Sequence, residues 1–175
     1  EGDIFGNTSF PEPETFYDDY ANRYFAEKWT SKIYPFMTKR MERWKPESRS
    51  LNVNGLNEEQ AKQKTYQHYM KNYLGCIKSL DDNIGRLLKY LGEKNLLNDT
   101  LIVYTSDNGM FLGEHGWYDK RLMYEESIRI PLVARYPNEI QPSSVSEEIV
   151  LNLDYAETFL DYAQAPIPCD MQGRS

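Results

Sequence analysis

The sequence is short of cysteine, of positive charge and of long apolar runs. Its two cysteines, Cys76 and Cys169, are too few for a disulfide framework or a cysteine-rich metal site. Aspartate and glutamate (27) outnumber lysine and arginine (20), so the formal net charge is −7 at pH 7. This balance argues against a nucleic-acid partner, which requires a basic surface. No apolar run approaches about 18 residues, so we expect no membrane-spanning helix.

The composition is nevertheless that of a folded domain, since 40% of the 175 residues are hydrophobic and 14% are aromatic. A chain of this length can bury a core of its own. The pattern changes near residue 57. Residues 1–56 have no clean periodicity, and we expect them to form an irregular, loop-rich segment with short helices over a surface.

Residues 57 to about 91 show the clearest pattern in the chain. Apolar residues recur there at spacings of three and four, which is typical of an amphipathic helix. Asn57 and Gln60 have the spacing of a capping box, and Gly92 is suited to end a helix. The sequence therefore predicts a helix of about 35 residues, roughly 50 Å long unless it bends near Gly75.

Two apolar runs follow this helix. TLIVYTSD (100–107) predicts a strand buried on both faces, as in a parallel sheet. IRIPLVARYP (128–137) predicts a second strand, in which Pro131 favours a sheet edge or the start of the strand. A short helix is expected between the runs, at 122–129, and Asp154 is expected to cap a last helix. The alternation of helices and strands predicts an α/β fold.

Asp107 and Asn108 follow the first strand, at the strand end where ligands bind in α/β sheets. Their oxygens suit calcium or magnesium, but calcium takes about six to eight oxygens, so further ligands would have to come from elsewhere. Asp-Asn-Gly is also an ordinary turn sequence, and both interpretations remain open on spacing alone.

Three more residues of this stretch are candidates for chemistry. Lys120 and Arg121 place two cations beyond the loop, where they could hold a tetrahedral anion or form a solvated surface pair. His115 could donate a proton or a hydrogen bond to an oxygen.

Taken together, T-S-D-N-G-x-x-L-G-E-H-G-x-x-x-K (105–120), Tyr124-Glu125-Glu126 and I-P-L-V (130–133) resemble the second half of the sulfatase family, within the alkaline-phosphatase-like superfamily. The resemblance extends upstream through YLGCIKSLDDNIGRLLKYLGEKNLLNDTLIVYTSD and downstream through LDYAETFLDYAQAPIPCDMQGRS. It covers residues 57–175, with a weaker match at PEPETFYDDY (11–20). It implies part of an alkaline-phosphatase-like sandwich, with a mostly parallel sheet flanked by helices.

The resemblance also implies roles for single residues. Asp107 and Asn108 match calcium ligands, and Lys120 matches the lysine that contacts the sulfate and stabilises charge on the leaving oxygen. His115 and Arg121 fall where substrate contacts are expected. DKRLMYEE followed by PLVARYP is most similar to N-acetylglucosamine-6-sulfatases, which implies a sulfated-carbohydrate substrate in glycosaminoglycans. The family's habit implies a periplasmic, lysosomal or secreted location.

The resemblance breaks at the nucleophile, which the family makes as a formylglycine from a C/S-x-P-x-R motif. Neither Cys76 nor Cys169 stands in such a motif. We therefore expect a C-terminal part of a sulfatase that is inactive by itself, with the formylglycine and further calcium ligands in a missing N-terminal part of the same enzyme. Two alternatives are a phosphatase or phosphodiesterase of the same superfamily and a catalytically dead module that binds sulfated glycans.

Overall fold

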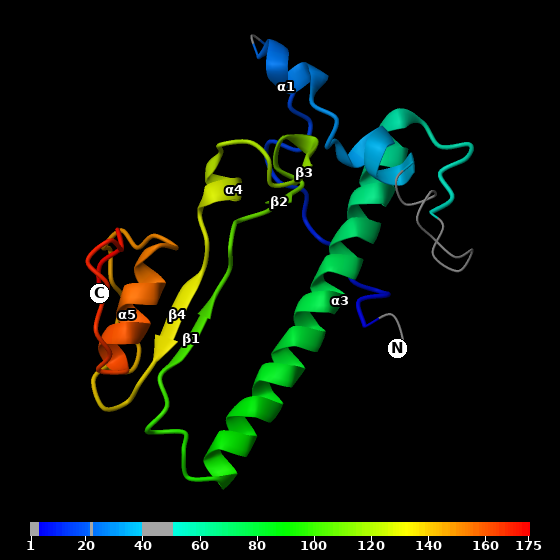
Figure 1. The fold of residues 1–175 in the computed structure, drawn as a ribbon. Coiled ribbons are helices and arrows are strands. Elements are labelled where there is room, and N and C mark those ends of the chain that lie inside the picture. The colour runs from blue at the N-terminus through cyan, green and yellow to red at the C-terminus, as the bar shows by residue number, and fades with distance from the viewer. Residues whose placement is uncertain (1–3, 22, 40–50) are drawn as a thin grey trace.

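The computed structural model describes residues 4–21, 23–39 and 51–175 (Figure 1). The long helix α3 (Glu58–Glu93) dominates the shape. It begins with the predicted capping box: the Asn57 side chain accepts from the Gln60 N–H at 2.8 Å, and the Gln60 side chain accepts from the Asn57 N–H at 3.2 Å. The helix continues through Gly75 and ends one residue beyond Gly92. The sequence prediction of this helix is therefore confirmed.

The two predicted strands exist but pair in an unexpected direction. β1 (Ile102–Thr105) and β4 (Leu132–Arg135) are antiparallel, with Ile102 opposite Arg135 and Thr105 opposite Leu132. A second antiparallel pair joins β2 (Phe111–Leu112) to β3 (Tyr118–Asp119). The mostly parallel sheet is not confirmed within the described residues. An apolar run indicates that a strand is buried, but it does not specify which strand will be its partner.

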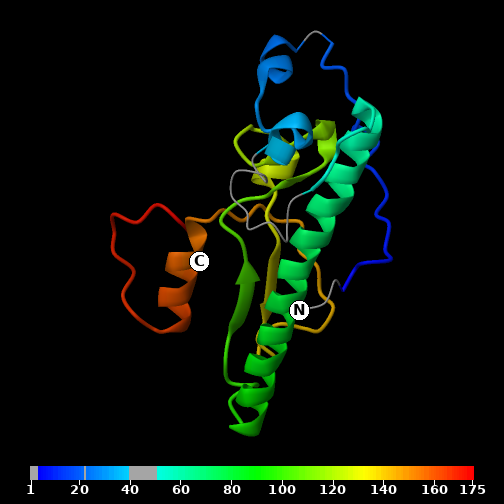
Figure 2. The ribbon, with the colours of Figure 1, turned by 90° about the vertical axis from the view of Figure 1, so that its right-hand side faces the viewer.

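The expected burial of the first strand on both faces is wrong for this chain. Tyr104 in β1 is 38% exposed, and Val133 in the neighbouring β4 is 62% exposed. The sheet and α5 (Asp154–Tyr162) lie along one side of the molecule, whereas the distal half of α3 extends beside them (Figures 1 and 2). Apolar side chains on this half, including Leu87, remain exposed.

α5 begins one position earlier than predicted, because Asp154 was expected to cap the helix and instead lies within it. Asp154 is its first helical residue, and Leu153 occupies the cap position without a side-chain cap. The Asp154 carboxylate instead accepts from the backbone N–H groups of Leu151 (2.8 Å) and Arg174 (3.0 Å). It therefore ties the chain on both sides of the helix to the helix start.

The segment before residue 57 contributes to the core. Its described part forms two short helical turns, α1 (Tyr24–Lys28) and η1 (Ile33–Met37). It passes along the first half of α3 (Figure 2). Phe16 and Ile33 are fully buried there against Tyr66 and Met70 of α3. A second cluster contains Phe111 and Trp117, packed against Tyr20, Trp29, Leu122 and Tyr124. These two clusters fix the loop that carries the candidate site.

α4 (Glu125–Ile128) is the short helix predicted between the strands. None of the helices in the described part of the chain combines the length and the apolar character needed to cross a membrane.

Candidate functional site

The loop that leaves β1 is held by its backbone. The Gly109 N–H donates to the Ser127 carbonyl at the end of α4 at 2.8 Å. The Asp107 carbonyl accepts from Asn152 at 2.9 Å. A Cβ at position 109 would lie 2.2 Å from the Glu126 carbonyl oxygen, so only glycine fits there. The Asp-Asn-Gly sequence is thus a turn whose conformation is set by close backbone approach to α4.

The side chains of Asp107 and Asn108 keep oxygen atoms that are available as metal ligands. Asp107 is exposed, and among the described residues its carboxylate meets only the Ser106 hydroxyl, at 3.4 Å. Asn108 is half-buried and donates from its amide nitrogen to the Gly109 carbonyl at 2.6 Å, which leaves its amide oxygen as an acceptor. Within the described ranges, no group of three His, Cys, Asp or Glu residues could hold a metal ion. The two residues therefore fit a hard cation as part of a ligand set that they do not complete.

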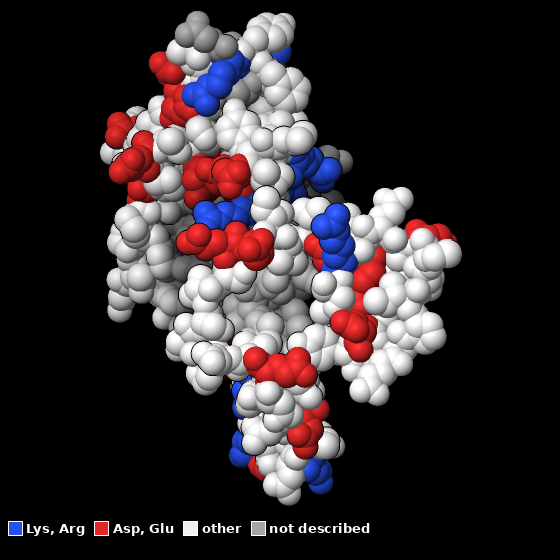
Figure 3. All heavy atoms as spheres, turned by 90° about the vertical axis from the view of Figure 1, so that its left-hand side faces the viewer, with Lys and Arg blue, Asp and Glu red and all other residues white. Residues whose placement is uncertain are grey.

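A cleft of about 750 Å³ opens beside this turn, between α3 and the loops that follow β1 and precede β4. α3 contributes an apolar wall that includes Tyr73, Ile77 and Leu80. The polar wall contains Asn108, Glu114, Glu125, Glu126 and Arg129. In the space-filling view, acidic side chains gather on the upper part of one face beside a recess, with basic atoms between them (Figure 3).

A smaller pocket of about 280 Å³ adjoins the cleft, because Tyr73 and Met110 line both. Its other walls are aromatic or charged and include Tyr69, Tyr118, Asp119 and Arg121. Burial raises the pKa of Tyr69 well above its ordinary value, and the Tyr69 hydroxyl donates to the Phe111 carbonyl at 3.0 Å.

The two predicted cations differ in their surroundings. Arg121 donates from Nε to Asp119 at 2.9 Å, so part of its charge is already paired. Lys120 is exposed, and its ammonium group has no hydrogen-bond or ion-pair partner among the residues that the structure describes. Lys120 is therefore the freer of the two to meet an anion.

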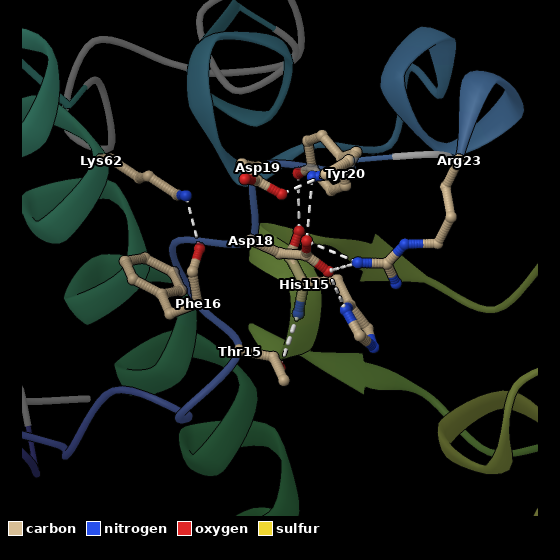
Figure 4. A network of polar contacts seen from close by, with 9 residues as sticks. Thr15, Phe16, Asp18, Asp19, Tyr20, Arg23, Lys62 and His115 are labelled. Carbon is tan, nitrogen blue, oxygen red and sulfur yellow. Dashed lines mark hydrogen bonds and ion pairs between the residues drawn. The ribbon is translucent and has the colours of Figure 1, made fainter.

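His115 is held more tightly than any other candidate. Its backbone lies in the left-handed region, with φ 55° and ψ 19°. The N–H donates to Thr15 at 3.0 Å, the carbonyl accepts from the Tyr20 hydroxyl at 2.6 Å, and Nδ1 meets Asp18 at 2.5 Å (Figure 4). The ring lies 5.1 Å from that of Trp117 and is 14% exposed.

Asp18 links His115 to the guanidinium group of Arg23. Arg23 donates to both Asp18 carboxylate oxygens, at 2.6 and 2.5 Å, and the Tyr20 N–H donates at 2.9 Å. Burial alone would raise the pKa of Asp18, but hydrogen bonds from His115, the Tyr20 N–H and Arg23 lower it overall. Sequence reasoning missed Asp18 and Arg23. The only signal near them was the weak match at residues 11–20.

The candidate residues do not all meet in one cavity. Asn108 lines the large cleft and Arg121 lines the smaller pocket, whereas Asp107, His115 and Lys120 line neither. The loop between β1 and α4 nevertheless carries all five, and it borders both cavities.

Known proteins that are similar to this chain match between about half and nearly all of it. The family described as N-sulphoglucosamine sulphohydrolase, C-terminal, matches residues 113–175. The N-acetylglucosamine-6-O-sulfatase of Bacteroides thetaiotaomicron is 40% identical over 98% of this chain and 37% of its own length. Human N-acetylglucosamine-6-sulfatase is 43% identical over 49% of this chain and 15% of its own length.

Two solved structures show the same fold. A protein solved in complex with its substrate D-glucosamine-2-N,6-O-disulfate superimposes with a TM-score of 0.84 and 38% identity, over 99% of this chain and 42% of that one. A phosphonate monoester hydrolase from Silicibacter pomeroyi gives a TM-score of 0.62 and 28% identity, over 90% of this chain and 33% of that one. The chain thus spans less than half of these longer relatives.

Proposed function

The chain belongs to the sulfatase family, and from that premise we propose that it forms one side of a site that hydrolyses the 6-O-sulfate ester of N-acetylglucosamine units in glycosaminoglycans. The observation that carries this proposal is the match, at a TM-score of 0.84, to a protein solved with a 6-O-sulfated glucosamine as its substrate. The similarity to the phosphonate monoester hydrolase is lower in both identity and TM-score, which favours sulfate over phosphate esters.

In this proposal Lys120 is the catalytic cation. Sulfate-ester cleavage develops negative charge on the leaving oxygen, and an ammonium group aimed at that oxygen stabilises the charge as it forms. The Lys120 ammonium group has no ion-pair partner among the described residues. This supports the role, because Lys120 breaks no ion pair when it binds the sulfate. His115 and Arg121 are proposed to contact the sugar.

Asp107 and Asn108 are proposed as two of the calcium ligands. When bound, calcium would polarise the sulfate oxygens. The exposed Asp107 carboxylate and the Asn108 amide oxygen supply the hard donors that the ion prefers. A formylglycine nucleophile and the remaining ligands are proposed to lie in an N-terminal part of the same enzyme.

Exposed apolar side chains of this chain support the proposal of an N-terminal part of the same enzyme. Leu80, Leu87 and Val133 are 44%, 53% and 62% exposed, and Leu80 lies in the wall of the open cleft. Further polypeptide packed there would bury apolar area that this chain leaves in water. A relative in Drosophila melanogaster is named an extracellular sulfatase, and we propose an extracellular, periplasmic or lysosomal location here.

The test measures sulfate release from N-acetylglucosamine 6-sulfate by the complete polypeptide that contains this chain. Lys120→Ala should lower kcat/KM by about 10²–10³ fold, as expected for loss of one group that stabilises developing charge. The matched control is Lys89→Ala, which removes an exposed lysine that forms an ion pair with Glu93 on α3 and should change little.

Three other outcomes would replace the proposal. Turnover of phosphate esters but not sulfate esters would favour a phosphatase. Salt-sensitive binding of sulfated glycans without turnover would favour a glycan-binding module. Sulfate release by the isolated 175 residues, abolished by Lys120→Ala, would contradict the assignment of the nucleophile to another part of the enzyme.

A further inference from the structure

The backbone of His115 has a strained, left-handed conformation, and one neighbouring segment holds it in place. A non-glycine residue at φ 55° is uncommon and is stable only when its surroundings hold it. Here Thr15 accepts from the His115 N–H, and the Tyr20 hydroxyl donates to the His115 carbonyl. Both contacts come from residues 15–20, roughly one hundred positions away in the sequence.

The same segment engages one of the two ring nitrogens. Nδ1 lies 2.5 Å from Asp18 Oδ2, and the Asp18 side chain is only 9% exposed. Every polar atom of His115 except Nε2 therefore has a partner from residues 15–20. Nε2 points away from Asp18 and has no hydrogen-bond partner in the described part of the chain (Figure 4).

We infer that Asp18, clamped by Arg23, is a positioning residue that presents Nε2 of His115 to a hydroxyl group of the sugar. Asp18 is ionised and accepts hydrogen bonds, so Nδ1 of a neutral imidazole carries the proton and Nε2 is left as the acceptor. The inference rests on the proposed function, in which His115 contacts the sugar, and it adds the residue that fixes the tautomer and the orientation of the ring.

The geometry around Asp18 predicts what an amide would do in its place. Arg23 donates to both Asp18 oxygens, whereas the Tyr20 N–H donates to Oδ1 alone, so in Asp18→Asn the amide oxygen is needed at the Oδ1 position. The amide nitrogen then faces His115 Nδ1. The amide nitrogen meets Arg23 in either orientation, but the reverse orientation would also set it against the Tyr20 N–H, which is less favourable. The imidazole must therefore move its proton to Nε2 and lose the acceptor that the sugar hydroxyl uses.

The experiment uses the complete polypeptide labelled with ¹⁵N-histidine, and the His115 signals are those that disappear in His115→Gln. At alkaline pH, where imidazole is neutral, the ring nitrogen shifts report the tautomer. We expect Nδ1–H in the wild type and Nε2–H in Asp18→Asn. We also expect kcat/KM for N-acetylglucosamine 6-sulfate to fall roughly tenfold in Asp18→Asn, as for the loss of one hydrogen bond.

Asp19→Asn is the matched control, because Asp19 accepts from the Ala21 N–H and does not contact His115. It should leave both the tautomer and kcat/KM unchanged. In a His115→Gln background, Asp18→Asn should have almost no further effect on kcat/KM, since its action passes through the histidine. A purely structural defect in Asp18→Asn would instead add to that of His115→Gln, and this would overturn the inference.

Failure of the positioning role and failure of the proposed function give different experimental results. If the wild type hydrolyses the sulfated sugar but Asp18→Asn keeps the Nδ1–H tautomer or keeps full kcat/KM, the positioning role is wrong and the proposed function stands. If the wild type neither binds nor hydrolyses sulfated sugars, the proposed function is wrong and the substrate role of Nε2 is wrong with it.

Discussion

Gly109→Ala tests how the candidate metal turn is built. The added Cβ would lie 2.2 Å from the Glu126 carbonyl oxygen and 2.9 Å from that of Arg129. Ordinary contacts begin near 3.4 Å, so α4 or the turn must move by about 1 Å. Both neighbours are backbone atoms, and the Gly109 N–H is itself bonded to the Ser127 carbonyl at 2.8 Å. Relaxation by a side-chain rotation is therefore excluded.

Overpacking of this kind costs about 1–3 kcal/mol of the free energy of unfolding. For a chain of this length, each kcal/mol corresponds to a fall in Tm of about 2–4 °C. Urea unfolding followed by circular dichroism gives the free energy, and thermal unfolding gives Tm. In the complete enzyme, the displacement of Asn108 should also weaken calcium-dependent sulfate release.

Gly85→Ala is the matched control for this prediction. Gly85 lies inside α3, and a Cβ there would meet no atom within 4 Å. Alanine in a helix interior should raise the free energy of unfolding by about 0.5–1 kcal/mol. The two substitutions therefore have opposite expected signs. A Gly109→Ala chain as stable as the wild type would refute the close approach of the turn to α4.

Three further predictions concern the core and the titrating groups. Phe16→Ala should lower the free energy of unfolding by about 3–5 kcal/mol, because Phe16 is fully buried; a change below about 1 kcal/mol would contradict that packing. The pKa of Asp18 lies below its ordinary value of 3.8, so its carboxylate stabilises the fold above that pH and the contribution is lost as pH falls through the folded pKa. Asp18→Asn should consequently destabilise the chain more at neutral pH than well below pH 3.8, as measured by urea unfolding. Burial raises the pKa of Tyr20 to about 12, so Tyr20→Phe should remove one late-titrating phenol from the ultraviolet alkaline titration and leave the early phase unchanged.

Local signals explain why much of the fold was predictable. Asn57 and Gln60 are three residues apart, so the capping box that starts α3 is visible in the sequence alone. The apolar runs likewise locate β1 and β4. Their antiparallel pairing was not predictable, because the register that places Thr105 opposite Leu132 depends on contacts between separate segments.

The candidate site was predictable only in part, for the same reason. Asp107, Asn108 and Lys120 lie in one short stretch, so their combined spacing identified the family although each alone fits a turn or a surface charge. Their roles remain predictions. Asp18 lies 97 positions before His115, in a segment without periodicity, and only the folded chain shows the contact between them.

The proposed site combines one side chain that the fold holds rigidly, His115, with two charged side chains that it leaves exposed, Asp107 and Lys120. In the proposed function His115 directs one lone pair at the sugar, so its orientation matters, and the chain holds it with three hydrogen bonds that leave its side chain 14% exposed. In the proposed function Asp107 and Lys120 act through full charges, and burying an unpaired charge is costly. Both charges lie in water and have no ion-pair partner in the described residues, so a cation at one and an anionic sulfate at the other would each gain an interaction without breaking an existing pair. On this reasoning Asp107→Asn should weaken calcium binding in the complete enzyme without lowering the stability of this chain, whereas Asp18→Asn should lower both stability and turnover. Equal losses of stability in the two variants would show that Asp107 is a structural residue of the turn.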